Sequence, residues 1–294
     1  MQSRHSLLSR FRPLVWFVAC FLVVAFVTRL ILLWMTGAEV PPSPGNWLYV
    51  FGVGLGYDLV TVVYAAWPLV VFLWLVPTRR GRLSAGRQWL LYALALALLC
   101  GACLGFLRWH FNADWKTAWP VLLPFLYALP LAAFTSTSRT GQWMLRAWCL
   151  LLLCGLLFVA VSELTFWDEF GPRFNFIAVD SLIYTREVIG NIEESYPIGR
   201  WLTMLAIAAV IIVALSRRSL RTEDDTSRFG ARSLVVLGWR VLTVLVTVSV
   251  HSGLKERMDH TYVNSLAGTG ISEFFAPFRN SNLNFHRFYR TLPD

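Results

Sequence analysis

The sequence predicts an all-α protein, a polytopic transmembrane bundle of five to seven helices with extracytoplasmic interfacial helices. Of its 294 residues, 56% are hydrophobic and only 15% are charged, and the mean hydropathy is +0.56. A soluble domain averages about 45–50% apolar and about 25% charged residues, so a water-soluble core could not bury this much apolar surface. The apolar residues also gather in runs close to the roughly 17–25 residues that cross the hydrocarbon of a bilayer.

Seven apolar runs are the candidate spans. The first follows Arg4, Arg10 and Arg12 and is too long for the apolar part of a signal peptide, which predicts an uncleaved anchor. The fourth is short and contains three prolines, which predicts a kinked span or a re-entrant segment. The bundle therefore has seven spans, or five if 88–134 does not cross. The runs are 14–35, 47–76, 88–107, 119–134, 143–162, 200–216 and 233–251.

The distribution of basic residues predicts the orientation. Four alternate loops are rich in arginine: 1–13 holds 3, 77–87 holds 4, 135–142 together with Arg146 holds 2, and 217–232 holds 5. The loops between them hold fewer basic residues for their length: none in 36–46, two in 108–118 and three in the longer 163–200. Because basic residues concentrate in cytoplasmic loops, we expect a cytoplasmic N-terminus, with 163–200 and the C-terminal tail outside. The same placement accounts for the net charge of +9 without a nucleic-acid partner.

Arg29 and Asp58 are charged residues inside the first two candidate spans. At 1.5 Å per residue they lie roughly 9 Å and roughly 16 Å below the outer ends of their spans. A charge in the hydrocarbon is costly unless it is paired or lines a polar cavity. We expect these two residues to form a buried ion pair. A proton or ion relay is the alternative, but no chain of further acidic residues and histidines accompanies them.

Familiar catalytic motifs are absent from the sequence. It contains no G-x-x-x-x-G-K-[ST], H-E-x-x-H or G-x-S-x-G motif, and no Cys/His cluster with metal-ligand spacing. All five cysteines lie within apolar runs; Cys100 and Cys103 have the spacing of a redox pair but not its strand–helix context. The sequence therefore predicts no catalytic residue and no metal ligand in this chain.

Three runs of the sequence resemble one protein family. They are GLGYDLVTVVYAAWP (54–68), FWDEF followed by RFNFIAVDSLIYTREVIGNIEESYP (166–197), and NSLAGTGISEFFAPFRNSNLNFHRFYRTLP (264–293). They are similar to an early span, the extracytoplasmic segment and the pre-catalytic linker of lipoteichoic-acid-synthase-like phosphoglycerol transferases, which belong to the sulfatase and alkaline phosphatase superfamily. The resemblance covers most of the chain outside 88–160, and 88–134 adds a pair of apolar runs that the family usually lacks.

The resemblance implies a protein of the bacterial cytoplasmic membrane that serves transfer of phosphoglycerol from phosphatidylglycerol to a glycan or polymer. In the family, the catalytic domain that follows the linker carries a threonine nucleophile and a divalent metal such as Mn or Mg. This sequence stops at Asp294, so none of those residues has a counterpart in it. We therefore expect 1–251 to form a transmembrane domain and 252–294 a linker towards an absent catalytic domain, and we expect the chain alone to be inactive. Its expected partners are membrane lipid and that domain.

The segment 163–199 is the expected docking surface. Its apolar residues recur at helical spacing while carboxylates fall on other faces, and Glu169–Pro197 carries a net charge of −3, which suits an anionic headgroup poorly. We expect an amphipathic helix at the outer membrane surface, fronted by aromatic residues, whose polar face docks the catalytic domain. An ordinary periplasmic loop is the alternative. The candidate docking residues are Phe166, Trp167, Asp180, Arg186, Glu187 and Glu194.

Two other functions remain open from the sequence. A small stand-alone transporter or channel is one, and the few buried charges and the lack of a visible inverted repeat argue against it. The membrane part of a related phosphoethanolamine transferase is the other, and only the motif resemblance separates it from a phosphoglycerol transferase.

Overall fold

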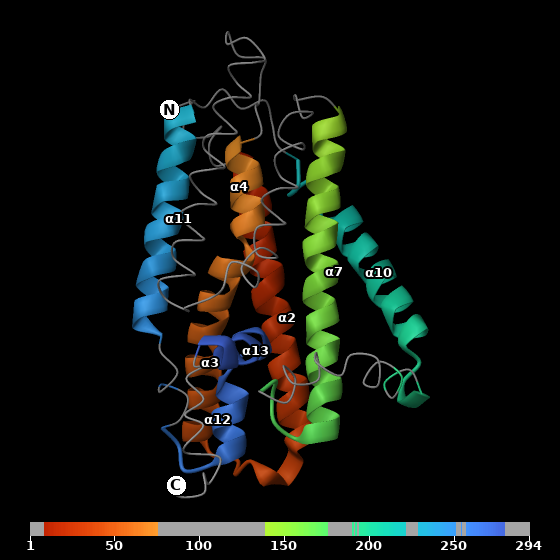
Figure 1. Ribbon diagram of the computed structural model, residues 1–294, viewed down its shortest axis with the longest axis vertical. Helices are drawn as coiled ribbons and strands as arrows, with labels where there is room; N and C mark the ends of the chain where they lie inside the picture. Colours follow the sequence, from red (N-terminus) through yellow and green to blue (C-terminus); the bar gives the residue numbers. More distant parts are fainter. Residues whose placement is uncertain are drawn as a thin grey trace, which may run out of the picture.

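The computed structural model describes residues 9–75, 139–175, 194–221, 229–250 and 257–279, together with 190, 192 and 254. The candidate spans 88–107 and 119–134 lie outside the described residues, as do the docking candidates Asp180, Arg186 and Glu187. The elements of the described residues are all helices, which form an elongated bundle (Figure 1): α2 (Arg12–Thr36), η1 (Gly37–Glu39), α3 (Pro44–Ala65), α4 (Trp67–Leu75), α7 (Arg139–Phe170), α10 (Ile198–Leu215), α11 (Phe229–Ser249), α12 (Thr261–Ala267) and α13 (Gly270–Arg279).

Five of these helices are long and apolar enough to cross a membrane: α2, α3, α7 from Leu145 onward, α10 and α11. The chain is therefore a multi-pass membrane protein, and the predicted all-α transmembrane bundle is confirmed. The helices alternate in direction, so that the end of α4 and the start of α7 lie at the same end of the bundle, near the N-terminus (Figure 1). The connection from α2 to α3 and the C-terminal helices α12 and α13 lie towards the opposite end.

The second apolar run forms two helices because Pro68 interrupts it. Proline has no amide hydrogen to donate to the carbonyl four residues earlier, so α3 ends before it and α4 begins at Trp67. Side chains supply partners for carbonyls near the break and at the end of α4. Trp239 Nε1 of α11 donates to the Val63 carbonyl at 3.1 Å, and Arg10 Nε donates to the Leu73 carbonyl at 2.6 Å.

Two apolar clusters pack the described bundle. The larger lies towards the N-terminal end and joins α2, α4, α7, α10 and α11; its buried residues include Phe17, Phe21, Leu69, Leu153 and Val213. The smaller lies towards the opposite end and contains Leu32, Val40, Val50, Trp167, Val263 and Leu266. Between these clusters along their helices, α2 carries Arg29 and α7 carries Glu163, both buried.

The segment after α11 packs back onto the bundle. α12 contacts α3 and α2, and α13 contacts α7 and α3; Figure 1 shows both short helices against the half of the bundle nearer the C-terminus. Tyr49 Oη of α3 donates to the Leu254 carbonyl at 2.7 Å, and the Asn264 side chain makes two hydrogen bonds with the backbone of Met258. Residues 261–279, expected as part of a linker, thus pack within the bundle, and their connection to a further domain stays a prediction.

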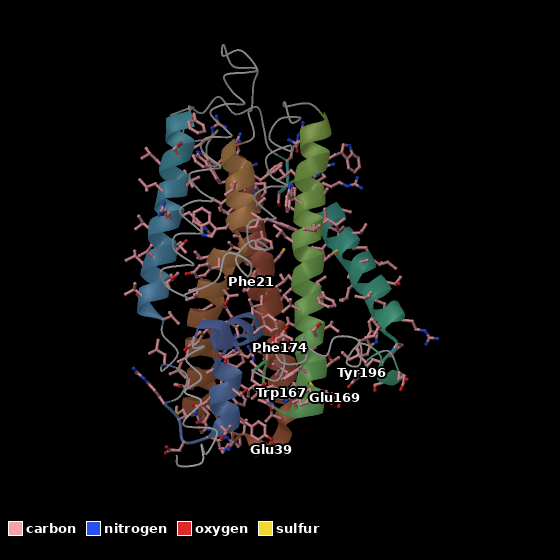
Figure 2. All side chains as sticks on the ribbon, viewed as in Figure 1. Phe21, Glu39, Trp167, Glu169, Phe174 and Tyr196 are labelled. Atoms are coloured by element: carbon pink, nitrogen blue, oxygen red, sulfur yellow. The ribbon has the colours of Figure 1, made fainter. Side chains whose placement is uncertain are left out.

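The expected interfacial segment 163–199 begins inside a spanning helix. The predicted span ended at 162, before a charged residue, but α7 continues to Phe170 because Glu163 is paired with an arginine. Phe166 and Trp167 therefore lie in the last turns of α7 and are buried, Trp167 at 5% exposure. The ring centroid of Phe166 lies 5.2 Å from that of Phe174, and the ring centroid of Trp167 lies 6.2 Å from that of Tyr262; Trp167 and Phe174 are labelled in Figure 2. In the structure these two residues belong to the packed bundle rather than to an exposed docking surface.

Candidate functional site

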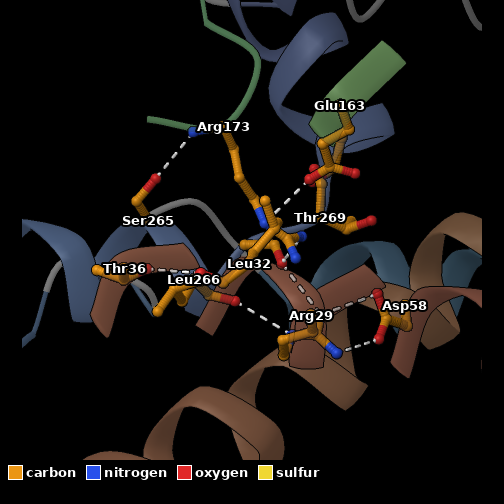
Figure 3. Close-up of polar contacts among 11 residues, drawn as sticks. Arg29, Leu32, Thr36, Asp58, Glu163, Arg173, Ser265, Leu266 and Thr269 are labelled. Atoms are coloured by element: carbon orange, nitrogen blue, oxygen red, sulfur yellow. Dashed lines mark hydrogen bonds and ion pairs between the residues drawn. The ribbon is translucent and has the colours of Figure 1, made fainter. Parts of the chain in front are cut away.

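The candidate site is a group of four buried charged side chains, which we call the charge cluster: Arg29, Asp58, Glu163 and Arg173. Arg29 of α2 is only 1% exposed. Its Nη1 and Nη2 donate to the two carboxylate oxygens of Asp58 on α3, at 2.7 and 3.1 Å (Figure 3). The planar guanidinium matches a carboxylate in this two-bond geometry. The buried ion pair between Arg29 and Asp58 that the sequence predicts is thus present in the structure.

Gly54 makes room for this pair. It lies four residues before Asp58, so both project from the same face of α3. A Cβ atom at position 54 would lie 2.5–2.7 Å from the Arg29 guanidinium atoms Cζ, Nε and Nη2. By contrast, a Cβ atom at Gly52 or Gly56 would meet nothing within 4 Å. Glycine is therefore needed at 54 because a buried arginine occupies the space of a side chain.

Glu163 and Arg173 form the second half of the charge cluster. Gly171 ends α7 at a φ of +83°, and the chain then brings Arg173 back towards Glu163 of that helix. Arg173 Nε lies 3.0 Å from Glu163 Oε1, but the two atoms are not aligned for a hydrogen bond and neither has another hydrogen-bond partner. The pairing is therefore mainly electrostatic. Burial lowers the pKa of Arg173 from its ordinary value, and the Glu163 carboxylate acts in the opposite direction.

Both arginines bind the backbone that links α12 to α13. Arg29 donates to the carbonyls of Leu266 and Gly268, each at 3.1 Å. Arg173 donates from Nη1 to the same Gly268 carbonyl at 2.6 Å, and its amide donates to Ser265 Oγ at 3.1 Å (Figure 3). The carbonyl groups left free where α12 ends thus find charged donors inside the bundle.

Gly270 completes the contact from the other side. A Cβ atom there would collide with both carboxylate oxygens of Glu163, so α13 begins at a glycine that packs directly on the acid. Beside this contact lies a cavity of about 20 Å³ whose lining includes Thr28, Glu163, Arg173 and Thr269. A cavity of this size holds about one water molecule. We expect that water to supply hydrogen bonds to the polar atoms of Glu163 and Arg173.

The four side chains of the charge cluster carry two positive and two negative charges, and the Glu273 carboxylate of α13 lies beside Gly268, close enough to act on Arg173. Breaking a buried ion pair by removing one partner typically costs about 3–5 kcal/mol, because an uncompensated charge remains. The hydrogen bonds and ion pairs of these four side chains join them to one another and to the carbonyls of Leu266 and Gly268. In the described ranges, no group of three or more His, Cys, Asp or Glu residues could hold a metal ion. The arrangement thus holds separate segments of the described chain together.

The sequence predicts only half of this cluster, the Arg29–Asp58 pair. Its charge pattern puts Glu163 and Arg173 in an outer loop, where a charge needs no partner, and the glycines of 264–270 contribute only to the resemblance. One signal was available: Gly54, Asp58, Arg173, Gly268 and Gly270 all fall within the three runs that carry the resemblance. Glu194, a candidate residue of the expected docking surface, is exposed and does not belong to the charge cluster.

No protein-family model matches the chain, and it matches no curated protein and no solved structure at a significant level.

Proposed function

We propose that this chain is the membrane anchor and platform of an envelope phosphoglycerol transferase in the bacterial cytoplasmic membrane. One observation carries the proposal: the three runs that resemble that family meet at the charge cluster. The first run contributes Gly54 and Asp58, the second Arg173, and the third the carbonyls of Leu266 and Gly268. Segments that lie far apart in the sequence thus depend on one another through the residues that the resemblance singles out.

The charge cluster suits a platform better than a transport path. A relay or channel needs charged groups that exchange partners along a route through the membrane. The buried charges of this cluster instead bind one another and the backbone of Leu266 and Gly268, and the cavity beside them has room for about one water molecule. A catalytic domain joined to or docked on 261–279 would be held at a fixed place near the lipid headgroups, which is what transfer from a lipid requires.

The charges at the helix ends support the proposed orientation. The end of the bundle near the N-terminus carries Arg10, Arg12 and the arginines of 217–221, whereas the opposite end carries five acids, Glu39, Asp168, Glu169, Glu194 and Asp259, beside the two exposed arginines Arg200 and Arg257. Basic residues favour the cytoplasmic side. The N-terminus is then cytoplasmic, and α12 and α13 lie at the outer half of the membrane.

Headgroup turnover in cells tests the function. Cells in which this chain is depleted are labelled with radioactive glycerol, and release of the phosphatidylglycerol headgroup is followed. We expect turnover to fall, to return with the wild-type chain, and not to return with Arg29→Leu. Unchanged phosphatidylglycerol turnover would contradict the proposal; a loss confined to phosphatidylethanolamine turnover would favour the phosphoethanolamine alternative.

A further inference from the structure

A groove opens between α7 and α10 on the side of the bundle away from α3. α10 is the least buried of the five described spanning helices, and Figure 1 shows it diverging from α7 towards the end that holds α12. The groove has a volume of about 420 Å³, within the range of small-molecule sites. It is lined by Met35, Val161, Leu164, Thr165, Asp168, Tyr196, Trp201, Met204 and Leu205.

The groove has an apolar floor and a polar mouth. Along α7 its lining runs from Val161 to Asp168, about 10 Å along the membrane normal at 1.5 Å per residue. Valine, leucine and methionine line the deeper part, and Asp168 and Tyr196 lie at the mouth, where the helices leave the hydrocarbon. Such an opening between spanning helices faces acyl chains rather than water.

A hydrogen bond joins the two sides of the mouth. Tyr196 Oη donates to Glu169 Oε1 at 2.7 Å and joins the end of α7 to the residues before α10 (Figure 2). This hydrogen bond is the main reason that the pKa of Tyr196 is raised to about 12, so the phenol stays a neutral donor at every physiological pH. The Tyr196 ring also packs on Trp201 at 5.3 Å, and aromatic residues of this kind favour the membrane interface.

The charges at the mouth select the headgroup. Asp168 and Glu169 are exposed in the last turn of α7, where the helix dipole adds negative potential. Asp168 lines the groove. Glu169, Glu194 and Arg200 do not line it, but each lies within two residues of a lining residue, so the described charges next to the mouth are three carboxylates and one guanidinium. Carboxylates attract an ammonium and repel an anionic headgroup, while a single arginine suits one phosphate.

We propose that the groove between α7 and α10 binds a phospholipid with an ammonium headgroup, such as phosphatidylethanolamine. One acyl chain lies along the apolar floor from Leu164 to Val161, the ammonium faces Asp168 and Glu169 at the mouth, and the phosphate faces Arg200. The lipid fills the wedge that the two helices leave. This inference is independent of the proposed function and assigns no chemistry to the lipid.

The test measures which lipids stay bound. The full chain is placed in vesicles of equal parts phosphatidylethanolamine and phosphatidylglycerol, extracted in mild detergent and analysed by native mass spectrometry. We expect phosphatidylethanolamine to be enriched about fivefold over phosphatidylglycerol, the scale of one partly exposed ion pair. The double change Asp168→Asn and Glu169→Gln, which keeps an acceptor for Tyr196, should reduce the bound ratio to that of the vesicles.

Two tryptophan variants separate the groove from the rest of α10. Leu205→Trp places a large ring in the groove and should abolish retained lipid, whereas Leu202→Trp, at a residue 45% exposed and outside the lining, should retain it. Asp259→Asn, an exposed acid elsewhere at this end, serves as the charge control and should leave the ratio unchanged. If Leu205→Trp fails to insert into the membrane, the double change Asp168→Asn and Glu169→Gln tests the proposal through the ratio of bound lipids.

Three results would overturn the proposal. They are equal retention of both lipids by the wild type, enrichment of phosphatidylglycerol, and a dimer mass without bound lipid.

Discussion

Arg29 joins three segments of the chain through one side chain. It pairs with Asp58 of α3 and donates to two carbonyls of the segment that links α12 to α13. In the hydrocarbon such a group is tolerated only because nearly all of its hydrogens have partners. We therefore expect the pair to favour this one packing of α2, α3 and α12, even where it adds little net stability.

We expect Arg29→Leu and Asp58→Leu each to lower the free energy of unfolding by about 3–5 kcal/mol, because each strands a buried charge. The double variant should lose less than the sum of the two by about 0.5–3 kcal/mol, since the stranded charge is gone. Unfolding in detergent micelles, followed by circular dichroism, measures all three. Additive losses would show that the two side chains do not depend on each other.

Gly54 offers a second test of the same site. Gly54→Ala places a methyl group against the Arg29 guanidinium, and overpacking of this kind costs about 1–3 kcal/mol. Gly52→Ala lies on the same helix with open space around it, so it should be neutral or more stable by up to about 1 kcal/mol, as alanine favours a helix. The melting temperatures of the two variants are compared with that of the wild type, and only Gly54→Ala should lower it. Equal behaviour would contradict the close approach of Arg29 to α3.

At the scale of elements, the sequence predicts helices better than it predicts their ends. The long apolar runs predict α2, α10 and α11 closely, because a bilayer imposes their length. The end of α7 was misplaced because a charge usually ends a span, and the pairing of Glu163 with Arg173 is invisible without the tertiary structure. The Arg29–Asp58 contact was predictable because two opposite charges inside adjacent spans must find partners.

The turn after α7 depends on Gly171, whose φ of +83° is unfavourable for a residue with a Cβ atom. A Cβ atom at this position would lie 3.8 Å from Tyr262 Oη, an ordinary contact distance, so a substitution would strain the backbone without crowding a neighbour. We expect Gly171→Ala to lower stability by about 1–2 kcal/mol. Gly155→Ala, in the open middle of α7, is the matched control and should not destabilise. Unchanged stability for Gly171→Ala would mean that the turn tolerates another conformation.

For the whole molecule, the orientation can be tested by cysteine labelling. In a background without native cysteines, we expect Asp259→Cys and Ser195→Cys to react with a membrane-impermeant maleimide in intact cells. Ser219→Cys, in the exposed turn after α10, should react only after permeabilisation, because the arginines of 217–221 favour the cytoplasm. Labelling of Ser219→Cys in intact cells would reverse the topology.

The platform proposal requires that the charge cluster, rather than the membrane alone, holds α12 and α13 on the bundle. Amide hydrogen exchange of the chain in lipid nanodiscs measures, residue by residue, how readily α12 and α13 open from the bundle. Replacing Arg173 with methionine removes one of the two arginine donors to the Gly268 carbonyl, the other being Arg29, and leaves Glu163 buried without its cation. We expect the amides of 261–270 to exchange at least about tenfold faster in Arg173→Met, a change that corresponds to about 1.4 kcal/mol, while those of α10 keep their wild-type rates. Wild-type exchange across 261–270 in this variant would show that the charge cluster does not hold the C-terminal segment, and the platform would lose its basis.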